Sequence, residues 1–221
     1  GGRDFVVVQM GDFGDFESTS SHGDGTTASM DKNYLKDVAS CRAALAEFHR
    51  GLDGTSCRLV ALEGNHEGPR VDRLLSKAPR YAGLMDPMKD IGWADLGWEV
   101  YPFRAIFKID DVAFSHYFSS GVMDKAIGGV NMARSMLLKG FLSCVADHSH
   151  VADYSTLVRA DGQRLTALST GVFCNHDDPI FDWNKSSHNY WSGLMVLRRL
   201  QGSDFDVDMV RLSSLMDEYH A

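Results

Sequence analysis

The residues Gly64-Asn65-His66-Glu67 follow an apolar run and carry side chains that can do chemistry. The run from Cys57 to Leu62 has the composition of a buried strand, so the polar tetrad is expected where that strand ends. Loops at the carboxyl ends of strands in open α/β sheets are common ligand-binding positions. An Asn beside a His at such a position offers one metal ligand and one proton donor.

Three further polar clusters follow apolar runs in the same manner. They are Gly11-Asp12-Phe13-Gly14-Asp15 after Phe5–Val8, Ser115-His116 after Val112–Phe114, and His148-Ser149-His150 after Phe141–Ala146. If the four strands are neighbours in one sheet, their polar ends reach one edge of it. One carboxylate, one amide oxygen and three imidazoles suit a pair of divalent manganese, iron, zinc or nickel ions. A single cluster of this kind is more often a turn or a structural histidine, so the prediction depends on all four together.

The order GDxxD, GNHE, His and HxH resembles that of the calcineurin-like metallophosphoesterase family. The resemblance covers most of the chain, from Asp4 to the region of Leu212. The stretches Ser115–Met123 and Arg159–Gly162 resemble more narrowly the bacteriophage-encoded branch of that family. The resemblance implies an α/β fold in which two β-sheets form a sandwich flanked by helices, in a single domain. It also implies hydrolysis of phosphate esters by a metal-bound hydroxide at a dinuclear metal centre.

The same resemblance implies which residues bind the two metals. Asp12 matches the carboxylate that bridges both ions, and His150 matches a ligand of the first ion. Asn65, His116 and His148 match the remaining ligands of the second ion. Two metals of this kind clamp the attacking and leaving oxygens and lower the pKa of a bridging water towards neutrality.

Two further residues match catalytic positions that do not bind metal. His66 matches the imidazole that contacts the phosphate and protonates the leaving oxygen, and Asp15 matches the carboxylate that holds that imidazole in place. A histidine can supply this proton near neutral pH. A carboxylate that orients the ring acts from outside the first shell of ligands.

The chain departs from the family pattern in two places. The family has an Asp-x-His motif about a strand and a helix before GDxxD, whereas only ten residues precede Gly11 and none is a His. With four ligands for the second metal and two for the first, we expect one ion to bind firmly and the other weakly. We also expect an upstream segment that supplies the missing strand, Asp and His. Asp147 stands where the family usually has Gly, and Asp tolerates left-handed backbone better than most residues.

The rest of the sequence predicts a compact order of helices and strands. Helices are expected over Asp31–Arg50, Gly68–Ala78 and Gly128–Lys139. The aromatic-rich stretch Tyr81–Pro102 is expected to be irregular and to serve packing. Strands are expected near Tyr154–Val158, Arg164–Ser169, Trp191–Arg199 and Phe205–Arg211, with a hairpin turn at Ala160-Asp161-Gly162.

The composition limits the class of protein. The 221 residues, of which 44% are hydrophobic, suit one domain with a sizeable core. Since no apolar run approaches the roughly 20 residues of a membrane span, we expect no membrane partner and a cytoplasmic enzyme, in the host cytoplasm if phage-encoded. Four widely spaced cysteines predict reduced thiols rather than a disulfide or zinc framework. A net charge of −8 disfavours broad electrostatic binding to nucleic acid.

Three functions remain open at this level. The first is a metal-dependent phosphatase or phosphodiesterase, the second is a nuclease of the same chemistry acting on phage or host DNA, and the third is a non-catalytic, metal-stabilised binding module. His66 favours the two enzymes, because a purely structural site has no need of an imidazole that is not a ligand. His176 follows another apolar run and is a candidate for substrate binding. The substrate and the oligomeric state are not predicted.

Overall fold

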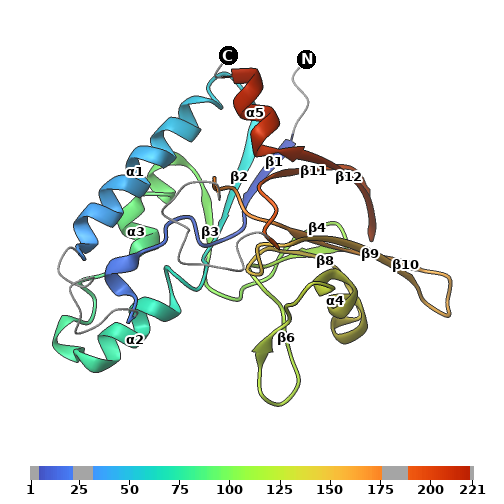
Figure 1. Ribbon diagram of the computed structural model, residues 1–221, viewed down its shortest axis with the longest axis horizontal. Helices are drawn as coiled ribbons and strands as arrows, with labels where there is room; N and C mark the ends of the chain where they lie inside the picture. Colours follow the sequence, from blue (N-terminus) through green and yellow to red (C-terminus); the bar gives the residue numbers. More distant parts are fainter. Residues whose placement is uncertain (1–4, 22–31, 176–188, 220–221) are drawn as a thin grey trace. The chain divides into compact units, whose positions relative to one another are not determined.

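The computed structural model describes residues 5–21, 32–175 and 189–219. Over these residues the chain is mixed α/β, with five α-helices and several β-sheets (Figure 1). The chain divides into two compact units, Gly1–Ala105 (unit 1) and Ile106–Ala221 (unit 2). Each unit has its own sheet and its own hydrophobic core.

Unit 1 is built on a parallel sheet of three strands, β1 (Phe5–Gln9), β2 (Cys57–Leu62) and β3 (Glu99–Tyr101). Strand β2 lies in the middle, and Val7 of β1 stands opposite Leu59 of β2. Because β1 and β2 are adjacent and run in the same direction, the loops that follow them leave from the same edge of the sheet.

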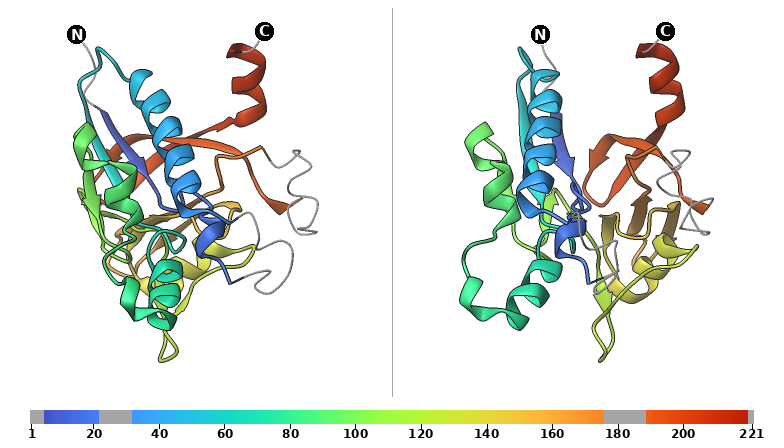
Figure 2. Two further views of the ribbon diagram at one scale, coloured as in Figure 1. Left: turned by 90° about the vertical axis from the view of Figure 1, so that its left-hand side faces the viewer. Right: turned by 60° about the vertical axis from the view of Figure 1, so that its left-hand side comes forward.

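Three helices accompany this sheet. Helix α1 (Tyr34–Arg50) begins after Asn33, whose side chain accepts hydrogen bonds from two backbone N–H groups of the first turn. Helix α2 (Pro69–Lys77) starts with proline just after the GNHE motif, and α3 (Pro87–Ile91) follows it. Figure 2 shows α1 lying along the strands of unit 1, where its residue Leu45 is fully buried.

Aromatic side chains fill the core of unit 1 and anchor its first polar loop. Trp93 is fully buried and lies edge-on to Trp98, with ring centroids 4.9 Å apart. Trp93 also meets Phe13, with centroids 4.8 Å apart. Since Phe13 lies between Asp12 and Asp15, this contact fixes the loop that carries both carboxylates.

Unit 2 contains a five-stranded sheet in the order β4-β5-β8-β10-β9. Its strands are β4 (Phe107–Ile109), β5 (Val112–Phe114), β8 (Ser143–Ala146), β10 (Arg164–Thr170) and β9 (Ala152–Val158). The central three, β5, β8 and β10, are mutually parallel, whereas β4 and β9 run antiparallel to their neighbours. The segments that follow β5 and β8 therefore leave from one edge.

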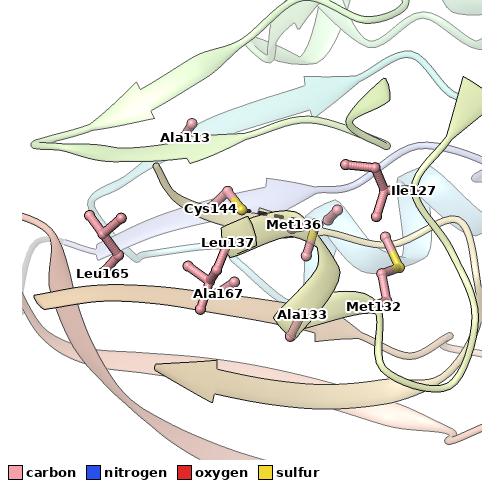
Figure 3. Close-up of a cluster of buried hydrophobic side chains, with 10 residues drawn as sticks. Ala113, Ile127, Met132, Ala133, Met136, Leu137, Cys144, Leu165 and Ala167 are labelled. Carbon is pink, nitrogen blue, oxygen red and sulfur yellow. Dashed lines mark hydrogen bonds between the residues drawn. The ribbon is translucent and has the colours of Figure 1, made fainter. Parts of the chain in front are cut away.

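Helix α4 (Met132–Gly140) covers this sheet with apolar side chains. Figure 3 shows Met136 and Leu137 of α4 directed towards Cys144 and Ala167 of the sheet. All four side chains are nearly or fully excluded from solvent. Cys144 Sγ lies 3.9 Å from Met136 Sδ, so the two polarisable sulfur atoms are in contact within this core.

Two hairpins and one helix complete unit 2. The short hairpin joins β6 (Ser119–Ser120) and β7 (Lys125–Ala126). The long antiparallel hairpin of β11 (Gly193–Gln201) and β12 (Asp204–Arg211) leads directly into α5 (Leu212–Tyr219), as Figure 2 shows.

The α/β class and most of the expected elements are confirmed. The stretch Tyr81–Pro102 is less irregular than predicted, because it contains α3, the 3₁₀ turn Ala94–Leu96 and β3. These elements are too short to show a hydrophobic period in the sequence. Strand β4, the β6–β7 hairpin and α5 were not predicted either. The two-sheet sandwich and the single-domain organisation stay predictions.

None of the helices in the described ranges has the length and apolar content needed to cross a membrane. The four cysteines are free thiols, as predicted from their spacing. Burial raises the pKa of Cys41 to about 11 and that of Cys144 to about 12. Both thiols are therefore protonated at neutral pH and serve the core rather than act as nucleophiles.

Candidate active site

The two polar motifs of unit 1 meet at the carboxyl edge of its sheet. Asp12 follows β1 with a left-handed backbone, at φ 51°, and His66 follows β2. Asp12 Oδ1 accepts a hydrogen bond from the backbone N–H of His66 at 2.9 Å. Asn65 lies in the same turn and is half-buried, so three residues predicted from the sequence lie together here.

Glu67 holds these two loops together, a role that the sequence interpretation missed. Its carboxylate accepts hydrogen bonds from the backbone N–H groups of Asp12 at 3.1 Å, Gly14 at 3.2 Å and Gly64 at 3.2 Å. The Glu67 residue is only 1% exposed. A buried carboxylate requires such partners, because an ionised group without them is costly to remove from water.

Gly64 is required by the same close approach. A Cβ at this position would lie 2.1 Å from the backbone nitrogen of Asp12, far inside the contact distance. Only glycine therefore allows the loop after β2 to pass this near to the loop after β1. The first residue of the GNHE motif is thus explained by packing, and the last by hydrogen bonding.

The His66 ring lies between two carboxylates. Its Nδ1 is 3.3 Å from Asp15 Oδ1, and its Nε2 is 3.4 Å from Asp12 Oδ2. The imidazole is 17% exposed, whereas Asp15 is 74% exposed. The Asp15 carboxylate thus lies on the solvent side of the ring, next to its Nδ1.

Arg70 is a second residue that the sequence interpretation missed. It lies on α2, four residues after His66, and its Nη2 is 2.6 Å from His66 Nε2. Its Nη1 donates to the backbone oxygen of Asp15 at 2.6 Å and lies 3.2 Å from Asp15 Oδ1. Since a guanidinium only donates hydrogen bonds, His66 Nε2 accepts this one, and the ring proton is left on Nδ1 facing Asp15.

Glu63 precedes the motif and ties it to the segment after β3. Its Oε2 accepts a hydrogen bond from the backbone N–H of Phe103 at 2.7 Å. Burial raises the pKa of Glu63 in spite of this bond. The folded state therefore favours the protonated carboxyl, and the associated stability is present at low pH and lost as the pH rises through the folded-state pKa.

We expect Glu63→Gln to stabilise unit 1 at pH 8, because an amide avoids the cost of desolvating the half-buried carboxylate. The midpoint of thermal unfolding should rise by roughly 1–3 °C, which corresponds to about 0.3–1.5 kcal/mol in a chain of this size. The gain should shrink towards pH 4. Thermal unfolding with a chelator present, at both pH values, measures this without a contribution from metal binding.

Glu99→Gln is the matched control for this prediction. A hydrogen bond from Arg58 lowers the pKa of Glu99, so its stabilisation is present at neutral pH and is lost as the pH falls. Glu99→Gln should therefore not raise the midpoint at pH 8. A rise of equal size in both variants would contradict the account given for Glu63.

Unit 2 brings two of its three predicted histidines into direct contact. His116 follows β5, and His148 follows the parallel neighbour β8. His116 Nε2 lies 3.1 Å from His148 Nδ1, and the two rings are perpendicular, with centroids 5.1 Å apart. His116 is 1% exposed, and its backbone oxygen accepts a hydrogen bond from Asp147 N at 3.1 Å.

The spacing of these two nitrogens fits a shared divalent ion. Imidazole nitrogens bind zinc at about 2.0–2.1 Å, so two of them on one tetrahedral ion stand about 3.3 Å apart. The observed 3.1 Å between His116 Nε2 and His148 Nδ1 is close to this value. The donor set of unit 2 therefore fits the metal that the sequence predicts, with imidazole as the ligand type.

The HxH turn is not an extension of strand β8, so strand alternation does not orient its histidines. Strand β8 ends at Ala146, and both His148 and His150 have left-handed backbones, at φ 42° and φ 60°. Asp147, which would tolerate such a conformation, does not have a positive φ. The ring of His150 packs against the ring of Tyr190, with centroids 4.7 Å apart.

Side-chain and backbone hydrogen bonds hold this turn to the rest of unit 2. Ser149, between the two histidines, donates from Oγ to Met132 Sδ of α4 at 2.8 Å. Ser169 of β10 donates to the backbone oxygen of Val151 at 2.6 Å. The backbone oxygen of His150 accepts from Trp191 N at 3.0 Å. These bonds support a left-handed conformation that is uncommon for residues other than glycine.

Comparison with protein-family models, with curated proteins and with solved structures finds no match for this chain. The resemblance stated above therefore rests on the motif residues themselves. His176, predicted as a substrate-binding candidate, lies outside the described residues. The other seven predicted residues are described, with Asp12, Asp15, Asn65 and His66 in unit 1 and His116, His148 and His150 in unit 2.

Proposed function

We propose that the protein is a metal-dependent phosphoesterase. The arrangement around His66 is the observation that carries this proposal. A half-buried imidazole is held between the carboxylates of Asp12 and Asp15, and the guanidinium of Arg70 contacts its Nε2. A purely structural metal site needs no such group, whereas transfer of a phosphoryl group needs both a proton donor and a cation.

The proposed metal ligands are the residues that the sequence motifs single out. They are Asp12, Asn65, His116, His148 and His150. Carboxylate, amide and imidazole donors together favour manganese, iron, zinc or nickel over calcium or magnesium. When bound, such ions supply positive charge to the phosphate and activate water as the nucleophile.

The residues of the chain would then act on the leaving group. We assign to His66 the donation of a proton to the leaving oxygen of the ester. Asp15 keeps the ring oriented through Nδ1, at 3.3 Å, so that Nε2 faces the reacting group. Asp12 adds a second, indirect constraint, because its Oδ1 fixes the backbone N–H of His66.

A substrate panel tests the proposed function. The protein is incubated with manganese and a phosphomonoester, a phosphodiester or single-stranded DNA, and product release is measured with and without chelator. Metal-dependent turnover of either small ester supports the proposal. Turnover confined to DNA would replace it by a nuclease, and a metal-binding protein without turnover on any of the three would replace it by a non-catalytic module.

Substitution of the two carboxylates of the first motif, Asp12 and Asp15, should have different effects on metal binding and on turnover. Asp12→Ala should lower the bound metal and with it the melting temperature, because a metal that binds the native state stabilises it by mass action. Asp15→Ala should leave the metal content unchanged and lower kcat by roughly 10–100-fold, the usual range for a partner that orients a catalytic group. Metal analysis after dialysis and steady-state kinetics measure the two effects.

Asp12→Asn is the matched control for Asp12→Ala. It retains an acceptor for the backbone N–H of His66, so the local turn is kept while the negative charge is removed. Metal loss in Asp12→Asn as well as in Asp12→Ala assigns the effect to the charge. Equal metal loss in the Asp12 and Asp15 variants would contradict the separate roles.

We further propose a cytoplasmic location, that of the host cell if the protein is phage-encoded. The four free cysteines support this, since compartments that form disulfides rarely retain several unpaired thiols. Measurement of free thiols in the protein as isolated from its natural source tests it, and a disulfide in that material would contradict it.

A further inference from the structure

Arg70 is the one cation placed against the predicted proton donor in the described part of unit 1. Both terminal nitrogens of its guanidinium, the Arg70 fork, make hydrogen bonds. Nη1 contacts the backbone and side chain of Asp15, and Nη2 contacts His66 Nε2. The side chain is 26% exposed, so it is accessible from solvent while being held in place. The bond to the Asp15 backbone oxygen, at 2.6 Å, does not depend on the protonation of any side chain.

A contribution of the Asp15–Arg70 ion pair to stability does not explain why Arg70 is held at this position. Asp15 is 74% exposed, and exposed ion pairs contribute little to stability because water competes for both charges. The bond to His66 is also unusual, since it uses the lone pair of the nitrogen assigned to face the leaving group. A nitrogen that accepts a hydrogen bond from Arg70 cannot at the same moment donate one to an ester oxygen.

Phosphate resolves this conflict, because its oxygens are better acceptors for a guanidinium than a neutral imidazole is. Arginine binds phosphate oxygens through parallel N–H groups, with both charge and geometry favourable. An ester whose leaving oxygen lies at His66 Nε2 has its phosphorus one bond further away, with its other oxygens near the Arg70 fork. Binding would therefore move the Nη2 hydrogen bond from His66 to the phosphate. The freed Nε2 lone pair could then take up a proton from water and pass it to the leaving oxygen.

We infer that Arg70 binds the phosphate of the substrate and that it selects phosphomonoesters over phosphodiesters. This inference rests on the proposed function and adds the substrate class. Near neutral pH a monoester carries close to two negative charges, since its second pKa is about 6. A diester carries one. The same guanidinium therefore stabilises the bound monoester more strongly, in proportion to the charge it faces.

The test is binding of inorganic phosphate to the metal-loaded full chain, measured by calorimetry, together with kinetics on a phosphomonoester and its methyl diester. Arg70→Gln should weaken phosphate binding by about 10–100-fold, the range of one or two hydrogen bonds to a charged group. It should lower kcat/KM more for the monoester than for the diester. Arg70→Lys, which keeps the charge and loses the fork, should lie between Arg70→Gln and the wild type.

Arg73→Ala is the matched control, since Arg73 is exposed on the same helix and makes no hydrogen bond or ion pair with the motif residues that the structure describes. It should leave phosphate binding unchanged. Metal content and melting temperature of Arg70→Gln should equal those of the wild type. Unchanged phosphate affinity in Arg70→Gln with a lower kcat would overturn the inference and make Arg70 a positioning residue for His66.

The inference and the proposed function fail in different ways. A wild type that does not bind phosphate overturns the inference, whatever its turnover. A wild type that binds phosphate through Arg70 but hydrolyses none of the esters supports the anion site and overturns the proposed function. A loss in Arg70→Gln that is equal for monoester and diester overturns the assignment of substrate class.

Discussion

Replacement of His66 by alanine is expected to abolish most turnover while leaving the bound metal nearly unchanged. His66 lies between Asp12 and Asp15 in a position to donate a proton and is not among the predicted ligands. General acid catalysis contributes about 10²–10⁴-fold, so kcat should fall by at least the lower end of that range. Steady-state kinetics with a substrate whose leaving group has a high pKa gives the clearest measurement, because that oxygen most needs the proton.

A second substrate provides the control for His66→Ala. An ester with a good leaving group, such as a nitrophenolate, departs without a proton, so the variant should retain much more of its activity on this substrate. Equal losses on both substrates would show that His66 does not act as the acid. Loss of a full equivalent of metal in His66→Ala would show instead that His66 is a ligand.

Glu67→Ala is expected to have the largest effect on stability. The substitution removes the acceptor of three backbone N–H groups and leaves a buried space where the carboxylate was. Hydrogen bonds to a charged group are worth about 1.5–3 kcal/mol each, and they are not additive, so we expect a loss of at least about 3 kcal/mol in the free energy of unfolding. This is a large part of the typical stability of about 5–15 kcal/mol.

Urea unfolding in the presence of chelator measures the Glu67→Ala effect without metal. Glu67→Gln retains one acceptor oxygen but turns an amide NH₂ towards backbone donors, so its loss should be smaller than that of alanine and still substantial. Glu47→Ala is the control, since Glu47 is an exposed residue of α1. A Glu67→Ala protein as stable as Glu47→Ala would refute the role assigned to this carboxylate.

The positions of the predicted motifs follow from the sequence because they depend on local pattern. Apolar runs before Asp12, His66, His116 and His148 predict strands, and β1, β2, β5 and β8 are present at these places. The strands pair in parallel within each unit, which brings Asp12 to His66 and His116 to His148. The prediction succeeds here because the hydrophobic pattern alone fixes where a strand ends.

The residues that hold these motifs in place were not predicted, because their partners are distant in sequence. Glu67 accepts from Asp12 and Gly14, which precede it by 55 and 53 residues, and no local pattern reports such contacts. The contact between Arg70 and His66 was weakly indicated by the sequence. Residues four apart share one face of a helix, and α2 begins just after His66. The conformation of the HxH turn depends in the same way on Met132 and Trp191.

The shared acceptor at Glu67 has a consequence for motion in the native state. The amide hydrogens of Asp12, Gly14 and Gly64 are all bonded to one carboxylate, so neither of the two loops can open without disturbing the bonds of the other. Hydrogen exchange of these amides should therefore proceed through one common opening, with similar protection for all three. Two loops more than 50 residues apart in sequence would then open and close as a single cooperative element.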